Sequence, residues 1–264
     1  MASAGSHHDR DRGQDFSLQL EVQFRDSATD LLEKADSIAA RGRDTGGISS
    51  DERDPIYRIA HTLKGLAASC GFSLTSVVAH RFADYLAELR TIEGAQLDGL
   101  QKFIDALGDL VDAGPNESKI NASEFIRKLP SRPAFDIGDI SVQDVEFFVV
   151  MPDDAVSRHV MRELQACGYR VAQESNSFTA IEIAAMTRPD PIIVTGMLHT
   201  LSGVDIISAF RAMPAIRDLP VAMITGDTRE EVAADGLPEA VPVIRKGRDF
   251  GDDLTDALTQ LGIL

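Results

Sequence analysis

The sequence is short of basic residues and of cysteine, and it has no long apolar run. Its 26 Lys and Arg are outnumbered by 42 Asp and Glu, for a net charge of −16, so nonspecific binding to a phosphate backbone is disfavoured. No stretch approaches the roughly 18 apolar residues of a membrane span. Residues 1–15 lack the apolar core of a secretory signal, and we therefore expect a cytoplasmic protein.

Cysteine is confined to Cys70 and Cys167, in a chain of 264 residues that is long enough for about two domains. The two cysteines fall in different predicted domains, each inside or at the end of a helix. Buried free thiols are therefore expected rather than a disulfide or a metal pair. The tract from His7 to Arg12 could bind a metal or be a tag remnant, but we interpret residues 1–15 as a disordered N-terminal tail.

A helix buried along one side is predicted around His61, because apolar residues recur there in steps of three and four, at Ile56, Ile59, Leu63, Leu66 and Cys70. At about 100° per residue, His61 lies about 200° from both Ile59 and Leu63, so its imidazole is expected in solvent. Lys64 and Gly65 follow one turn later on the same face. An exposed histidine, a cation and a bare backbone patch thus share one surface.

That combination suits a phosphoryl carrier. An imidazole near neutral pH has a free nitrogen lone pair that can attack phosphorus without an adjacent base. Lys64 supplies a mobile charge for phosphoryl oxygens. A glycine in mid-helix is unfavourable, so Gly65 indicates that a partner approaches closely there, whereas Gly71 is expected to end the helix as its C′ residue.

A surface histidine beside a surface lysine would explain an isolated His-x-x-Lys, but the longer string is more specific. His61-Thr62-Leu63-Lys64-Gly65 followed by Gly71-Phe72 resembles the histidine-containing phosphotransfer (HPt) domain, most of all the phosphotransfer segment of chemotaxis histidine kinases, over residues 16–114. The resemblance implies a helical bundle whose exposed histidine exchanges phosphoryl with an Asp of a separate receiver domain. It also implies that the partner receiver supplies the Mg²⁺, and that this chain has no cofactor of its own.

Four amphipathic helices are predicted in this part of the chain and together make an all-α, antiparallel four-helix bundle. They are expected over residues 16–41, from Asp54-Pro55 through Cys70, from Ser73 through Leu89, and along Leu97, Leu100, Ile104, Leu107 and Val111. Residues 115–143 contain three prolines and many polar residues, and we interpret them as a linker that holds a short helix over residues 120–129.

In the third of these helices, His80 lies off the apolar stripe. It is either a solvated surface residue or, as the resemblance to chemotaxis kinases implies, a second imidazole close to His61. Those kinases usually place a Glu three residues later to orient the active ring, and this chain has Ala83 there. Asp84 is adjacent but about 100° further round the helix, so we expect His61 to lack the orienting hydrogen bond.

Residues 144–264 alternate between strand and helix, which predicts a doubly wound α/β domain with a five-stranded parallel sheet. Strands are expected at residues 145–151, 169–172, 191–195, 220–224 and 241–244. The order and spacing resemble a response-regulator receiver domain. Thr225 occupies the position of the family's switch Thr, Lys246 that of its Lys, and Gly203 is also at the expected spacing.

The acidic positions depart from that family. Pro152 stands where the first acid belongs, Asp153 aligns with the second, and a one-residue shift would recruit Asp154 as well. The phosphoacceptor Asp is replaced by Thr195, and the Pro expected four residues later is His199. A neutral hydroxyl is a poor replacement for a carboxylate nucleophile that also helps to hold Mg²⁺, so we interpret the domain as a pseudo-receiver with Asp153 and Asp154 as vestigial metal ligands.

Three functions are compatible with this organisation. The first is a phosphorelay carrier that uses His61 and a non-phosphorylatable receiver-like domain for docking, regulation or homodimer formation. The second is an adaptor that binds and sequesters a partner response regulator or histidine kinase without transferring phosphoryl. The third is a kinase or phosphatase, and a kinase would need an ATP-binding domain for which we find no stretch. The intact His61 and Lys64 favour the carrier, whose partners would be receiver domains of response regulators or hybrid kinases.

Overall fold

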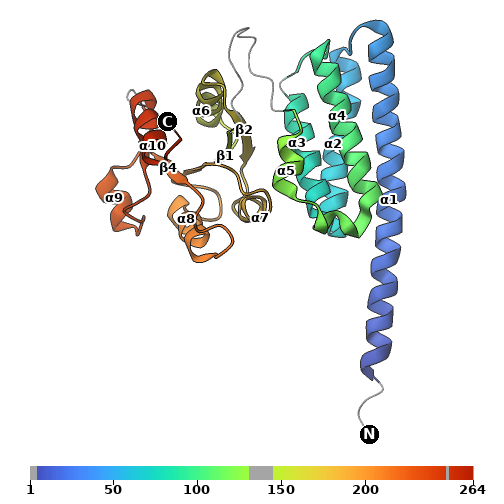
Figure 1. The fold of residues 1–264 in the computed structure, drawn as a ribbon, viewed down its shortest axis with the longest axis horizontal. Helices are drawn as coiled ribbons and strands as arrows, with labels where there is room; N and C mark the ends of the chain where they lie inside the picture. Colours follow the sequence, from blue (N-terminus) through green and yellow to red (C-terminus); the bar gives the residue numbers. More distant parts are fainter. Residues whose placement is uncertain (1–4, 88, 131–144, 248–249, 264) are drawn as a thin grey trace. The chain divides into compact units, whose positions relative to one another are not determined.

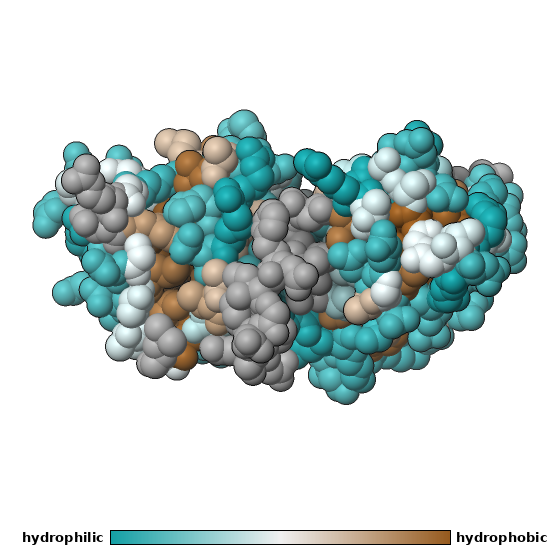
Figure 2. Space-filling model, turned by 90° about the horizontal axis from the view of Figure 1, so that it is seen from above, coloured by the Kyte–Doolittle hydropathy of each residue, from teal (hydrophilic) through white to brown (hydrophobic). Residues whose placement is uncertain are grey.

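A computed structural model describes residues 5–87, 89–130, 145–247 and 250–263, with side chains from residue 18 onward. The chain divides into two compact units, residues 1–133 and 134–264 (Figure 1). Hydrophilic side chains dominate the visible surface of both, as the composition requires (Figure 2). Within the described residues, no helix has the length and apolar character needed to span a membrane.

The first unit is a bundle of four helices, α1 (Gly5–Thr45), α2 (Ser50–Cys70), α3 (Ser73–Ala87) and α4 (Ala95–Ala113). Helix α1 packs on α2 and α4, and α3 packs on the same two helices. The predicted four-helix bundle is confirmed. All five apolar positions predicted for the last helix are buried, at Leu97, Leu100, Ile104, Leu107 and Val111.

Helix α1 is longer at both ends than the predicted residues 16–41, and it begins at Gly5, within the segment predicted as a tail. The first proline of the sequence is Pro55, so no proline interrupts helical hydrogen bonding in this segment. The buried face of α1 carries Phe24, Ala28, Leu32, Ala35 and Ala39. Leu18 and Val22 lie on the other side and are mostly exposed.

Helix α2 begins earlier than Asp54-Pro55, which corrects the predicted start. Ser49 is its N-cap, and the Glu52 carboxylate accepts hydrogen bonds from the Ser49 backbone N–H at 3.2 Å and from the Ser49 hydroxyl at 2.9 Å. These bonds lower the pKa of Glu52. Pro55 is therefore inside the helix. The other end is as predicted, because Gly71 has a φ of 82° and closes α2.

The segment after α4 is part of the bundle, so the predicted linker is wrong for residues 115–130. It forms a 3₁₀ helix, η1 (Gly114–Lys119), and a short helix, α5 (Ala122–Arg127). Glu117 is buried and accepts hydrogen bonds from the first turn of α3, which ties η1 to the bundle. The remainder of the predicted linker, residues 131–143, lies outside the described residues.

The second unit is a five-stranded parallel sheet with the order β2-β1-β3-β4-β5, as predicted for a doubly wound receiver-like fold. The strands are β1 (Glu146–Val150), β2 (Arg170–Glu174), β3 (Ile192–Thr195), β4 (Val221–Thr225) and β5 (Val243–Arg245). Their register places Val150 beside Val194 and Thr195 beside Ile224, so the strands end together at one edge.

Helices cover both faces of this sheet (Figure 1). They are α6 (Ala155–Ala166), α7 (Ser177–Thr187), α8 (Gly203–Ala212), α9 (Arg229–Ala234) and α10 (Phe250–Gln260). Helices α6 and α10 bury one face, in a cluster that includes Phe147, Val149, Leu164 and Leu254. Helix α9 is only six residues long and was not predicted from the sequence.

The predicted burial of the cysteines is wrong. Cys70 is half-buried and Cys167 is exposed, and both are free thiols. Cys167 is the C-cap residue of α6, where the helix ends at the surface, so the apolar face of α6 does not cover it.

Candidate functional site

His61 is exposed on α2 while its neighbours Ile59 and Leu63 are buried, which confirms the predicted geometry of this helix face. Beyond Leu63 the buried line continues through Ala67, and the predicted Leu66 and Cys70 are only half-buried. Leu66 lies about 20° beyond Ile59 at the margin of the buried stripe, and Cys70 is the last residue of the helix.

An aromatic ring contacts the imidazole of His61. Tyr57 lies one turn before His61, and the two ring centroids are 4.6 Å apart with planes at 69°, an edge-to-face arrangement. Among the described residues, the ring nitrogens of His61 make no hydrogen bond. Sequence reasoning missed Tyr57, although its i, i+4 spacing to His61 was a usable signal.

Lys64 and His80 are brought together across α2 and α3. The Lys64 ammonium donates a hydrogen bond to Nδ1 of His80 over 3.0 Å. An ammonium has no lone pair, so Nδ1 must be the acceptor, and the proton of the neutral ring is then on Nε2. That nitrogen lies 3.8 Å from the Asp84 carboxylate. His80 is thus not simply a solvated surface residue, because its ring accepts a hydrogen bond from the lysine that follows His61.

Ala83 occupies the position at which chemotaxis kinases usually have an orienting Glu, and it is buried. Ala83 has only 2% of its surface exposed, and the nearby carboxylate of Asp84 is directed to His80. That His61 lacks an orienting carboxylate stays a prediction.

Gly65 is exposed, and a Cβ built on it would meet nothing within 4 Å. Its backbone carbonyl accepts a hydrogen bond from the Ser69 hydroxyl at 2.8 Å, one turn later in the same helix. The bundle itself therefore does not require a glycine at this position.

In the second unit, the predicted positions gather at the edge of the sheet where the strands end. Thr195 is 2% exposed at the end of β3, and its hydroxyl accepts a hydrogen bond from the Lys246 ammonium at 3.2 Å. The Thr225 hydroxyl donates to the Asp227 carboxylate at 2.8 Å and accepts from the Asp227 backbone N–H at 3.1 Å. Asp227 was not identified from the sequence, although a hydroxyl residue two positions before a carboxylate is typical of a local turn.

Gly203 fits closely against this edge. A Cβ on Gly203 would lie 2.2 Å from the Thr195 backbone oxygen, so no larger residue fits there without moving β3 or α8. The predicted spacing of this glycine therefore has a steric cause in the fold. His199, which stands where a Pro was expected, is exposed.

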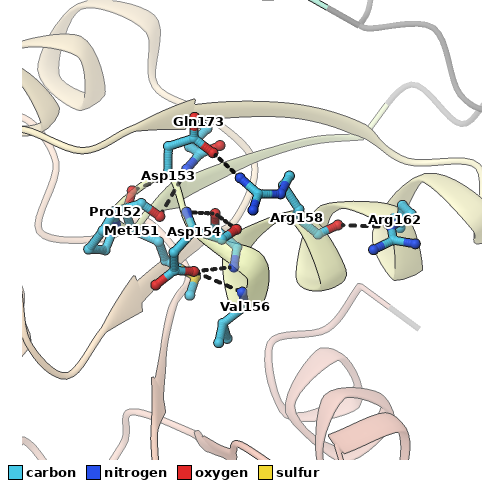
Figure 3. A network of polar contacts seen from close by, with 9 residues as sticks. Met151, Pro152, Asp153, Asp154, Val156, Arg158, Arg162 and Gln173 are labelled. Atoms are coloured by element: carbon cyan, nitrogen blue, oxygen red, sulfur yellow. Dashed lines mark hydrogen bonds and ion pairs between the residues drawn. The ribbon is translucent and has the colours of Figure 1, made fainter.

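The acidic pair after β1 has other partners (Figure 3). Asp154 is the N-cap of α6, and its carboxylate accepts from the backbone N–H groups of Val156 at 2.8 Å and Ser157 at 2.9 Å. Asp153 is paired with Arg158 at 3.1 Å on the exposed surface. In the ranges that the structure describes, no three His, Cys, Asp or Glu side chains are grouped as ligands of one metal ion.

Pro152 contributes its backbone rather than an acid. The Gln173 side-chain amide donates to the carbonyl oxygens of Met151 at 3.2 Å and of Pro152 at 3.3 Å, which fixes the loop that follows β1 (Figure 3). The residues present at this edge therefore do not fit a divalent cation site built from clustered carboxylates.

Known proteins resemble parts of this chain. The family model described as "Hpt domain" matches residues 19–113. Among curated proteins, the chain is 29% identical over 99 residues to the transcriptional regulatory protein PrrA of Mycobacterium tuberculosis, which covers 38% of this chain and 42% of that protein. It is 30% identical over 105 residues to the response regulator MprA of Mycobacterium ulcerans, covering 40% of this chain and 41% of that protein. The chain thus spans about two fifths of the length of the curated relatives it matches.

Solved structures with a similar fold include a response regulator from Chloroflexus aurantiacus, at 21% identity and a TM-score of 0.41, which covers 45% of this chain and 98% of that one. The chemotaxis response regulator CheY4 of Vibrio cholerae is also similar, at 21% identity and a TM-score of 0.40, covering 44% of this chain and 98% of that one. The chain thus has an Hpt match in its first unit and a five-stranded parallel sheet in its second.

Proposed function

We propose that this protein is a phosphorelay carrier that holds a phosphoryl group on His61. The observation that carries the proposal is an exposed imidazole on a rigid helix, with the ammonium of Lys64 one turn later and an open patch at Gly65. Receiver domains of response regulators or hybrid histidine kinases are the partners that this site suits. Such a partner would also supply the Mg²⁺ for the transfer.

The chemistry requires little from the carrier itself. A lone pair on a ring nitrogen of His61 attacks the phosphorus of a partner's aspartyl phosphate, a nitrogen–phosphorus bond forms, and the bond from phosphorus to the aspartyl oxygen breaks. The partner keeps the electron pair as a free carboxylate. Lys64 lies where its charge can attract phosphoryl oxygens, and His80 restricts the movement of that lysine. The reverse reaction passes the group to a second receiver.

We assign the second unit as a pseudo-receiver that serves docking, dimerisation or regulation. Thr195 carries a hydroxyl that is almost fully protonated at neutral pH, and the Lys246 ammonium that donates a hydrogen bond to it cannot act as its base. Asp154 is engaged by a helix cap and Asp153 by Arg158. This arrangement supports a domain that is folded as a receiver but is not phosphorylated.

In this proposal the protein is a transfer intermediate rather than an enzyme, and it depends on an external kinase for its phosphoryl group. The direct test is incubation with phosphorylated receivers that carry labelled phosphoryl. Label should appear on the wild-type protein, be absent in His61→Gln and remain in His80→Gln. Because a phosphoramidate is acid-labile, brief acid treatment should remove it.

Two outcomes would contradict the carrier. Label retained by His61→Gln would place the acceptor elsewhere. Stable binding of a receiver with no label on the wild-type protein would favour the adaptor, which holds a regulator without transferring phosphoryl.

A further inference from the structure

Tyr57 and His61 occupy one face of α2, and their side chains meet edge to face at 4.6 Å between centroids. We propose that Tyr57 is a positioning residue, whose ring holds the imidazole plane of His61 in the orientation that phosphoryl transfer needs. The proposal rests on the proposed function of His61, and it assigns to an aromatic ring the role that a hydrogen-bonded carboxylate fills in similar proteins.

The imidazole needs such support because no polar group provides it. The His61 ring nitrogens make no hydrogen bond with the described residues, Ala83 is buried, and Asp84 is directed to His80. Rotation of a histidine ring about its Cβ–Cγ bond is broad and roughly two-fold. An exposed imidazole without a neighbour would therefore sample many planes. Contact with the Tyr57 ring restricts that rotation from one side.

Orientation matters because the transfer is in-line. The attacking nitrogen lone pair must point along the axis of the phosphorus–oxygen bond that breaks, and misdirected rings are unproductive. An edge-to-face contact between aromatic rings is strong enough to change a rate about two- to tenfold if it is lost. The contact fixes the plane of the ring but not the position of its proton, whereas a hydrogen bond would fix both. Both neutral tautomers of His61 should therefore be populated.

The ring of Tyr57, not its hydroxyl, carries this role. The hydroxyl makes no hydrogen bond with the described residues, so Tyr57→Phe keeps the contact and Tyr57→Leu removes it at similar volume. Since Tyr57 is half-buried, a merely structural role is the competing explanation. A structural role would lower the melting temperature of Tyr57→Leu but leave the rate per folded molecule unchanged.

The experiment uses the full chain in three forms, wild type, Tyr57→Phe and Tyr57→Leu. Imidazole proton and nitrogen shifts of His61 are measured by NMR without phosphoryl donor, and single-turnover transfer from a phosphorylated receiver is measured below the melting temperature of every form. We expect ring-current shifts of His61 in wild type and Tyr57→Phe that disappear in Tyr57→Leu. We also expect transfer to be about two- to tenfold slower in Tyr57→Leu only.

Each other result overturns the proposal in a recognisable way. Identical His61 shifts in wild type and Tyr57→Leu would show that the rings are not in contact in solution. Changed shifts with an unchanged rate would show a contact that does not position the nucleophile. Equal slowing in Tyr57→Phe and Tyr57→Leu would assign the effect to the hydroxyl. If the wild-type protein accepts no phosphoryl at all, the proposed function fails. The NMR shifts of His61 still decide whether Tyr57 orients the ring.

Discussion

Replacing Glu117 by alanine should destabilise the helical unit by about 3 kcal/mol, although this residue lies in a segment with the composition of a linker. The buried carboxylate accepts hydrogen bonds from the backbone N–H of Leu74 at 3.0 Å, the backbone N–H of Thr75 at 3.1 Å and the Thr75 hydroxyl at 2.5 Å. These N–H groups belong to the first turn of α3 and have no partner within their own helix.

The magnitude follows from those contacts. A hydrogen bond to a charged group contributes about 1.5–3 kcal/mol, and loss of a helix cap costs about 0.5–2 kcal/mol. The three bonds at Glu117 are not additive, because water can reach part of the space that alanine leaves. A loss of about 3 kcal/mol lies within these limits and corresponds to a fall of about 10 °C in melting temperature for a domain of this size.

The assay is thermal unfolding of the full chain, monitored by calorimetry so that the unfolding transitions of the two units can be resolved. Glu124→Ala is the matched control, since Glu124 is an exposed glutamate on α5 whose ion pair with Lys128 is at the surface. Glu117→Gln should fall between wild type and Glu117→Ala, because it keeps an acceptor oxygen without the charge. Equal melting of Glu117→Ala and Glu124→Ala would refute the reasoning.

Three further predictions concern other parts of the chain. Gly65→Arg should leave the melting temperature unchanged but slow transfer from a receiver about tenfold, because the larger side chain weakens docking by roughly 1.4 kcal/mol. An unchanged rate would mean that Gly65 is outside the interface. Burial, with a smaller contribution from a nearby carboxylate, raises the pKa of Tyr85 to about 12. This value lies above the pKa near 10 of an unfolded tyrosine, so the protonated phenol of Tyr85 favours the folded state. Its contribution to the free energy of unfolding is complete below pH 10 and is lost as the pH rises towards 12. Urea unfolding across that pH range should show a smaller decline of the free energy of unfolding in Tyr85→Phe than in wild type. Finally, full-length His61→Gln incubated with acetyl phosphate and Mg²⁺ should gain no mass, and a phosphoryl group on Thr195 would show a working receiver.

The sequence was sufficient for features that depend on local periodicity and on spacing. The buried face of α4 and the alternation of strand and helix in the second unit are examples. Each follows from the spacing of apolar residues within a single helix or strand. The exposure of His61 was predictable for the same reason. Gly71 was predictable because a left-handed residue ends a helix most easily as glycine.

The features that could not be predicted depend on partners distant in the sequence or on competing local signals. Glu117 bonds to residues 42 and 43 positions away, and no local pattern identifies that pairing. The Lys64–His80 hydrogen bond likewise joins two helices. At the start of α2, two cap signals compete, and Ser49 with Glu52 begins the helix before Asp54 because the pair forms reciprocal hydrogen bonds.

If the second unit is the pseudo-receiver proposed above, the helix cap made by Asp154 limits what one substitution at Thr195 could restore. Restoring an acid by Thr195→Asp would place a carboxylate beside Lys246, which is a favourable charge pair. Asp153 is paired with Arg158, and Asp154 would offer a divalent cation only the carboxylate oxygen that does not accept from the N–H groups of Val156 and Ser157. A single back-substitution is therefore expected to restore the charge of the acceptor without restoring metal-dependent phosphorylation.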